Sequence, residues 1–209
     1  MGSGNKVEFF VAVCALVSSL AAVYIAWDQG RVMRAQQHGA VYPVLQVDGY
    51  AANDGRVGRL GIRVQNSGAG PALIESVQLR IAGAPTEGLG PYLATMPIGY
   101  ELSWQALTGR ALAAGDSVTP LDIAWPMDVF GPDLVQRVTA DAETWVFEIC
   151  YCSVFDRCWT TRSIGQSRAN RVESCPRSER DVFEALGREN VRLMMQRSEG
   201  LASPAKDGL

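Results

Sequence analysis

Four clustered cysteines are the residues whose type and spacing could do chemistry. Cys150 and Cys152 form a C-x-C motif, Cys158 follows six residues later, and Cys175 comes further along the chain. Side chains alternate along a β-strand, so a strand over the motif puts Cys150 and Cys152 on one face. A turn at residues 153–157 brings Cys158 opposite Cys152, where a disulfide can form if the Cβ vectors face each other. Cys175 can then reach Cys150.

The same cysteines allow three other interpretations. Four thiolates could bind a metal ion, but zinc ligands usually come as C-x₂₋₄-C pairs on turns rather than as C-x-C in a strand. A redox-active C-x-C motif is the second interpretation, although no Lys or His adjoins it and Glu148 would raise a thiol pKa. Buried free thiols in a cytosolic domain are the third. Cys14, in an apolar stretch, is interpreted as a small apolar residue.

Other catalytic and binding patterns are weak. The one histidine, His38, lies in a polar segment without partners for a metal site or a general base. The glycine-rich stretches follow strands and open no helix, so they cannot cradle a phosphate. A net charge of −3 and scattered arginines argue against nucleic-acid binding. We therefore expect no enzyme, no cofactor, no metal and no nucleic-acid partner.

An apolar segment near the N-terminus predicts a membrane anchor. Residues 9–27 carry no charge, and at about 1.5 Å per residue they span roughly the 30 Å core of a bilayer. Aromatic rings lie at both ends, as in membrane helices: Phe9, Phe10, Tyr24 and Trp27. A cleaved signal peptide, with small residues at Ser19 and Ala21, is one alternative, and a buried globular helix is another.

The charges on either side of this segment hardly determine its orientation in the membrane. Lys6 and the α-amino group precede the segment, whereas Arg31 and Arg34 follow it, partly offset by Asp28. The positive-inside rule then leans slightly toward a cytosolic domain. Disulfides between the cysteines would instead favour a domain on the side of the membrane away from the cytosol, because disulfides persist in oxidising compartments.

The sequence predicts the following order of segments. Residues 1–8 form a short tail, 9–27 the transmembrane helix, 28–42 a helical stalk, 43–165 a β-sandwich domain, 166–199 a polar linker with a C-terminal helix, and 200–209 a disordered tail. The stalk ends before Pro43. The C-terminal helix is expected to start at Ser178, with Asp181 as the acid of a capping box.

Short strands separated by turns are expected throughout the domain. Residues 44–50 and 57–65 predict a hairpin, and the NSGAGPA stretch after it predicts a turn. In that turn Asn66 can act as a cap, Gly68 and Gly70 can take positive φ, and Pro71 starts the next strand.

Later strands are expected at residues 117–125, at an edge or bulged because of Pro120, and at residues 144–153. Residues 132–140 could form a short helix, and residues 83–99 a long connection. About seven strands of this kind indicate an antiparallel β-sandwich.

Two turns, at residues 66–72 and 112–116, resemble those of bacterial immunoglobulin-like β-sandwich modules. Together with the anchor, the stalk ending in MRAQQ and the hairpin YCSVFDRCW, they make most of the chain similar to a group of uncharacterised single-pass bacterial membrane proteins. The resemblance implies a fold and an anchor in the bacterial inner membrane, and it implies no activity. In such a protein, two disulfides would mean a periplasmic domain.

Three functions follow as hypotheses. The first is a membrane-anchored interaction module that presents loops such as residues 83–99 to an envelope or membrane protein. The second is a thiol-based redox or metal-binding protein that uses the four clustered cysteines. The third is a sensor that transmits the state of the domain through residues 31–37 of the stalk.

Overall fold

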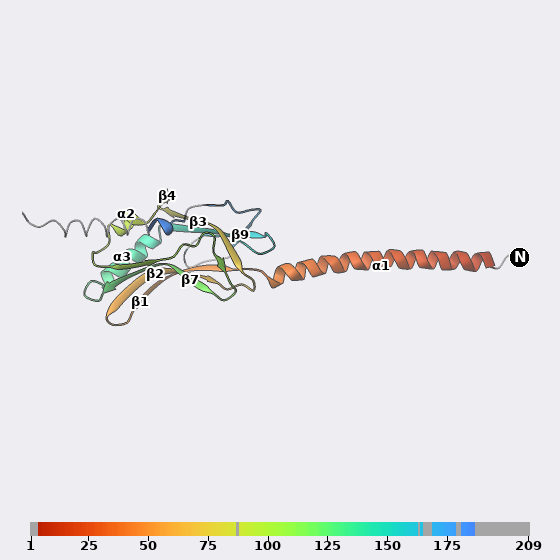
Figure 1. Ribbon diagram of the computed structural model, residues 1–209, viewed down its shortest axis with the longest axis horizontal. Helices are drawn as coiled ribbons and strands as arrows, with labels where there is room; N and C mark the ends of the chain where they lie inside the picture. Colours follow the sequence, from red (N-terminus) through yellow and green to blue (C-terminus); the bar gives the residue numbers. More distant parts are fainter. Residues whose placement is uncertain (1–3, 87, 163, 165–168, 179–180, 187–209) are drawn as a thin grey trace, which may run out of the picture. The chain divides into compact units, whose positions relative to one another are not determined.

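A computed structural model describes residues 4–86, 88–162, 164, 169–178 and 181–186 (Figure 1). The chain divides after Ala40 into two compact units. The first unit holds one helix, α1 (Gly4–Ala40). The second holds the strands and two further helices. The expected disordered tail, residues 200–209, and most of the expected C-terminal helix lie outside the described residues.

Helix α1 contains the whole apolar segment and continues through the expected stalk. Its 37 residues correspond to about 55 Å at 1.5 Å per residue. The mean hydropathy reaches 2.4 over its most apolar 18 residues, and none of that stretch is buried inside the molecule. A helix that buries no face against protein lacks the packing that stabilises helices in water. Helix α1 is therefore long and apolar enough to cross a membrane.

The first sheet is antiparallel, with the strand order β1-β2-β7-β5. Its strands are β1 (Leu45–Asn53), β2 (Val57–Asn66), β5 (Glu101–Trp104) and β7 (Ser117–Pro126). The expected hairpin of β1 and β2 is confirmed. In its turn, the carboxylate of Asp54 accepts hydrogen bonds from the backbone N–H groups of Val57 and Arg56, both at 2.8 Å. These bonds favour the charged form and lower the pKa of Asp54.

Strand β7 is bulged but does not lie at an edge, because β2 and β5 flank it. Its register against β2 shifts between the pairs Ile62↔Leu121 and Val64↔Val118, so two residues of β7 face one residue of β2. One of the two is Pro120, which has no N–H group to donate. The bulge lets the proline stand inside a sheet without breaking the ladder.

The second sheet is also antiparallel, with the order β10-β9-β8-β3-β4. Its strands are β3 (Ala72–Ile81), β4 (Ala84–Thr86), β8 (Trp145–Cys152), β9 (Cys158–Arg162) and β10 (Asn170–Val172), and β6 (Ala111–Leu112) pairs with the start of β3. The expected strand over residues 144–153 is confirmed as β8.

One hydrophobic cluster joins the two sheets. Strand β2 contributes Leu60, Ile62 and Val64 at alternate positions, and β8 contributes Phe147 and Ile149, which are fully buried. Alternation of this kind puts one face of each strand toward a shared core. The prediction of a mainly β, antiparallel domain behind an apolar helix is therefore confirmed.

Two helices complete the described domain: α2 (Gly90–Leu93) and α3 (Pro132–Ala142). Helix α2 lies in the long connection between β4 and β5. Leu89, Leu93 and Met96 of this connection are buried, whereas Ile98 is 81% exposed. The connection thus packs largely onto the core, and Ile98 is the large apolar side chain that its described residues expose. Its expected role in binding stays a prediction.

The turn after β2 is organised by a buried asparagine. The Asn66 amide donates to the carbonyl oxygens of Gly70 and Leu112, at 2.8 and 3.0 Å. Its oxygen accepts from the N–H groups of Val44 and Gly68, at 3.2 and 3.0 Å. Asn66 is fully buried, and these four bonds satisfy its amide. Its expected role as a cap is confirmed, and Pro71 directly precedes β3.

The glycines of this turn are needed for space rather than for an unusual backbone. Neither Gly68 nor Gly70 has positive φ, so that expectation was wrong. A Cβ at Gly68 would lie 2.4 Å from the Tyr42 carbonyl oxygen, and one at Gly70 would lie 2.4 Å from the Val41 carbonyl oxygen. The backbone that enters the domain therefore runs directly against the turn.

Asp181 does not act as the third residue of a capping box. Its buried carboxylate accepts from the N–H groups of Leu107 and Thr108, at 2.7 and 2.6 Å, and from that of Phe183 at 2.7 Å. The described helical turn covers only residues 184–186, so Asp181 caps that turn and ties it to the loop before β6.

Candidate functional site

The β8–β9 hairpin positions three of the four clustered cysteines. Cys152 and Cys158 are direct partners in the register of β8 and β9, and Cys150 is opposite Thr160. The side chains of these three cysteines are buried. Strand alternation puts Cys150 and Cys152 on one face of β8, away from Phe147 and Ile149 of the core. The cysteines therefore gather on the outer face of the second sheet.

Two disulfides join the four cysteines. The bond between Cys152 and Cys158 has an S–S distance of 2.06 Å and a Cα–Cα distance of 4.0 Å. The bond between Cys150 and Cys175 has an S–S distance of 2.05 Å and a Cα–Cα distance of 5.6 Å. These are the two pairs expected, the first from strand register and the second because Cys175 could reach Cys150 across the polar segment. Cys14, within α1, is exposed and forms no disulfide.

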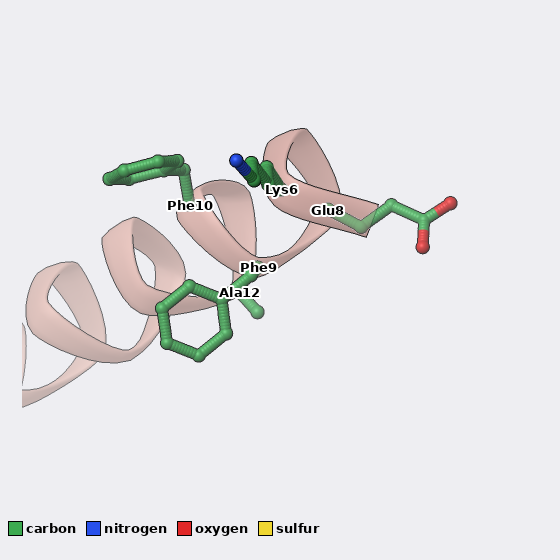
Figure 2. Close-up of a pocket in the computed structure, with 5 residues that line it drawn as sticks. All are labelled: Lys6, Glu8, Phe9, Phe10 and Ala12. Carbon is green, nitrogen blue, oxygen red and sulfur yellow. The ribbon is translucent and has the colours of Figure 1, made fainter. Parts of the chain in front are cut away.

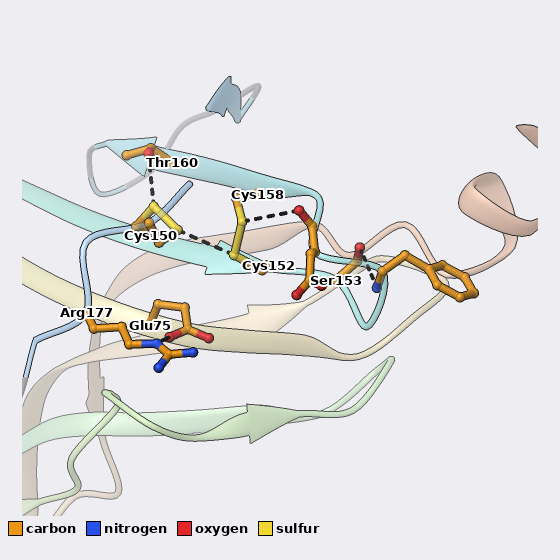
Figure 3. Close-up of a disulfide and its surroundings, with 10 residues drawn as sticks. Glu75, Cys150, Cys152, Ser153, Cys158, Thr160 and Arg177 are labelled. Carbon is orange, nitrogen blue, oxygen red and sulfur yellow. Dashed lines mark hydrogen bonds and ion pairs between the residues drawn. A yellow bond between two sulfur atoms is a disulfide. The ribbon is translucent and has the colours of Figure 1, made fainter. Parts of the chain in front are cut away.

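The segment that carries Cys175 covers the outer face of the sheet. Besides the disulfide, the Arg177 guanidinium lies 3.8 Å from the Glu75 carboxylate of β3 (Figure 3). The backbone N–H of Ser178 donates to the Glu75 carbonyl oxygen at 3.4 Å. The ion pair is exposed and contributes little by itself. The disulfide is consequently the covalent link between this segment and β8.

The two disulfides are in contact with each other. The Sγ atoms of Cys152 and Cys175 are 3.7 Å apart. The sulfurs of Cys152, Cys158 and Cys175 all lie within 4.8 Å of one another. That spacing would suit a metal ion if the sulfurs were thiolates, but a disulfide sulfur is not the thiolate ligand that zinc requires. In the disulfide-bonded state, the cluster is not a metal centre.

The polar groups nearest the cluster differ from those expected. Glu148, expected to raise a thiol pKa, is engaged by the Arg162 guanidinium at 2.9 Å. The hydroxyl of Thr160 lies 3.6 Å from the Cys150 sulfur and can donate a hydrogen bond to it. A donor at this position favours negative charge on Cys150 when the disulfide opens. The sequence alone hides this contact because it depends on the register of β9 against β8.

The loop between β8 and β9, residues 153–157, has a fixed shape and an apolar tip. The N–H of Ser153 donates to the Arg157 carbonyl oxygen at 2.8 Å, and that of Asp156 to the Ser153 carbonyl oxygen at 3.1 Å. Val154 and Phe155 at the tip are 49% and 46% exposed. The Cys152–Cys158 disulfide closes the base of the loop. The sequence predicts only a turn at these residues, although two large apolar side chains in a hairpin turn are a visible signal.

Aromatic residues connect this loop to the entry of the chain into the domain. The rings of Tyr42 and Trp159 meet edge to face at 4.9 Å, and Trp159 stacks on Tyr151 at 6.1 Å. The Tyr151 hydroxyl accepts from the backbone N–H of Leu45 at 3.4 Å. Burial raises the pKa of Tyr151 to about 12. The hairpin that carries the loop therefore packs against residues 42–45, at the start of the domain.

A hollow lies at the start of α1 and does not form a site. Its lining residues all come from one helix: Lys6, Glu8, Phe9, Phe10 and Ala12 (Figure 2). Their side chains are exposed and point away from the helix in different directions. Binding pockets enclose most of a ligand's surface, which a single helix cannot do.

The strongest candidate site is therefore the β8–β9 hairpin, with its apolar loop and its paired disulfides. No model of a known protein family matches the chain, and no curated protein matches it.

Proposed function

We propose that the chain is a single-pass membrane protein whose immunoglobulin-like domain binds an envelope protein through the β8–β9 loop. The observation that carries the proposal is the exposure of Val154 and Phe155 on a loop that is closed by a disulfide and two backbone hydrogen bonds. A loop whose backbone is already held in one conformation loses little entropy on binding, which raises affinity.

The immunoglobulin-like assignment is supported by strand order. An immunoglobulin sandwich has strands A, B, E and D in one sheet and C, F and G in the other. Strands β1, β2, β7 and β5 follow the first order, and β3, β8 and β9 follow the second, with β4 as an added strand beside β3. In this correspondence, the β8–β9 loop is the F–G loop. That loop belongs to the binding surface of immunoglobulin variable domains.

Anchoring and compartment are supported by α1 and by the disulfides. Helix α1 is long and apolar enough to cross the bilayer once, and a lipid bilayer is its natural partner. Disulfides persist in oxidising compartments, which for a bacterial inner-membrane protein means the periplasm. The domain is accordingly assigned to the periplasmic face, with the partner among the proteins of the envelope.

Photo-crosslinking from the loop tests the binding function. A photoreactive phenylalanine analogue in place of Phe155, in the full chain in intact cells, is expected to give one or a few adducts of discrete mass. Replacing Val154 with serine in the same chain should reduce their yield severalfold, because the apolar contact area shrinks. The measurement is an immunoblot followed by mass spectrometry of the adducts.

The matched control places the same analogue at Ile98, which is more exposed than Phe155 and lies in the connection between β4 and β5. Position 98 should give no adduct in common with position 155. Equal adducts from both positions would mean random collision, and adducts from position 98 alone would move the binding surface to that connection. Either result contradicts the assignment to the β8–β9 loop.

A further inference from the structure

The two disulfides are close enough to react with each other. Sulfur atoms 3.7 Å apart are in van der Waals contact, and the atoms in question, in Cys152 and Cys175, belong to different disulfides. Thiol–disulfide exchange proceeds by attack of a thiolate on a disulfide sulfur. A thiolate formed at Cys175 therefore meets a reactive disulfide without any rearrangement of the fold.

Cys175 is also the cysteine of the cluster through which an outside thiol can enter. Its side chain is partly exposed, whereas those of Cys150, Cys152 and Cys158 are buried. Attack on its sulfur expels the Cys150 thiolate, toward which the Thr160 hydroxyl can donate at 3.6 Å. A stabilised thiolate is a better leaving group, so attack at Cys175 is favoured over attack at Cys150.

We propose that the four cysteines form a thiol–disulfide exchange site, entered at Cys175 by an external dithiol. The dithiol reduces the Cys150–Cys175 bond: two electrons and two protons pass to these cysteines, and the dithiol leaves as a disulfide. The Cys175 thiolate then attacks Cys152. A Cys152–Cys175 bond forms, the Cys152–Cys158 bond breaks, and Cys158 takes up the proton that Cys175 lost.

The product is an isomer with one disulfide and two thiols, at Cys150 and Cys158. The exchange step itself consumes no oxidant or reductant. It opens the disulfide that closes the β8–β9 loop and leaves the loop held by its hydrogen bonds. The exchange does not depend on whether that loop binds a partner, so the two proposals fail separately.

The variant Cys150→Ser isolates the exchange step. The full chain is purified in detergent micelles and carries both Cys150→Ser and Cys14→Ser. Its remaining cysteines are Cys152, Cys158 and Cys175. Trypsin separates them, because residues 138–157, 158–162 and 172–177 are different peptides bounded by arginines. Mass spectrometry after acid quenching should find both the Cys152–Cys158 and the Cys152–Cys175 linkages, each at a tenth or more of the molecules.

Two comparisons show whether the Cys152–Cys175 linkage comes from the folded structure: one with the linkages of an unfolded chain, and one with the wild-type protein. Of the two linkages that involve Cys175, an unfolded chain would favour Cys158–Cys175, because its loop is shorter than that of Cys152–Cys175 and costs less entropy to close. Of the same two, the folded chain should favour Cys152–Cys175, because those sulfurs touch. Wild-type protein treated with limiting dithiothreitol, a dithiol, should pass through the same Cys152–Cys175 species. Exclusive retention of Cys152–Cys158, or a majority of Cys158–Cys175, would overturn the proposal.

The variant Cys175→Ser is the matched control. It keeps the Cys152–Cys158 disulfide and frees a thiol at Cys150, which is not among the three sulfurs that lie within 4.8 Å of one another. Cys150 and Cys152 share the tryptic peptide 138–157, so fragment-ion mass spectrometry is used here, and it should find the Cys152–Cys158 linkage alone. Exchange in this variant to the same extent as in Cys150→Ser would remove the special role of Cys175.

Discussion

Replacing Asn66 with alanine is expected to lower the free energy of unfolding by about 4 kcal/mol. The amide is fully buried and makes four hydrogen bonds to backbone groups of three segments, around Val44, Gly70 and Leu112. Each lost bond costs about 1 kcal/mol, and more where a buried partner stays unpaired. Denaturant unfolding of the full chain in micelles, followed by tryptophan fluorescence, measures the change.

Two further variants test whether the hydrogen bonds of the Asn66 side chain cause this loss of stability. Asn66→Asp keeps the volume and the acceptor oxygen but loses the two donated bonds, so it should destabilise the domain at neutral pH by at least about 2 kcal/mol. Ser67→Ala removes an exposed hydrogen bond to Gln46 and should cost less than about 1 kcal/mol. Equal effects of Asn66→Ala and Ser67→Ala would show that Asn66 does not organise the turn.

Replacing Gly70 with alanine is expected to cost about 3 kcal/mol or to prevent folding. The added Cβ would lie within about 2.5 Å of the Val41 Cα, carbonyl carbon and carbonyl oxygen. Backbone atoms cannot move aside as a flexible side chain can, so the cost falls at the upper end of the range for overpacking. The same unfolding measurement, together with the yield of folded protein, tests this.

Gly131→Ala is the matched control for Gly70→Ala. No atom lies within 4 Å of a Cβ at Gly131, and its φ of −125° is open to alanine. It precedes α3, where a change from glycine to alanine costs on the order of 1 kcal/mol or less. A loss of stability at Gly131 as large as that at Gly70 would refute the steric explanation.

Regular periodicity made much of the fold predictable. Alternating apolar residues such as Leu60, Ile62 and Val64 determine which face of β2 is buried, and Asp54 marks the turn before it. The same alternation puts Cys150 and Cys152 on one face of β8. Period and turn length together then position Cys158 opposite Cys152, so that pair follows from local geometry, whereas the pair Cys150–Cys175 depends on a later segment of the chain.

Features that depend on distant segments were not predictable from local sequence. Pro120 suggested an edge strand, yet a bulge accommodates it between β2 and β5. Asp181 suggested a capping box, yet its carboxylate is held by N–H groups more than 70 residues earlier in the chain. Gly70 suggested positive φ, yet it is required by the close approach of Val41. In each case, tertiary contact decides the role of the residue.

Cysteine labelling in intact cells tests the central claim most directly, namely that α1 anchors the domain on the oxidising side of a bacterial inner membrane. A Cys14→Ala chain, which keeps only the four clustered cysteines, is treated with a membrane-impermeant maleimide before and after reduction. The account predicts no labelling before reduction and labelling of several cysteines after it. Labelling that needs a permeant reagent and no reductant would contradict it, because the thiols would then be free and cytosolic.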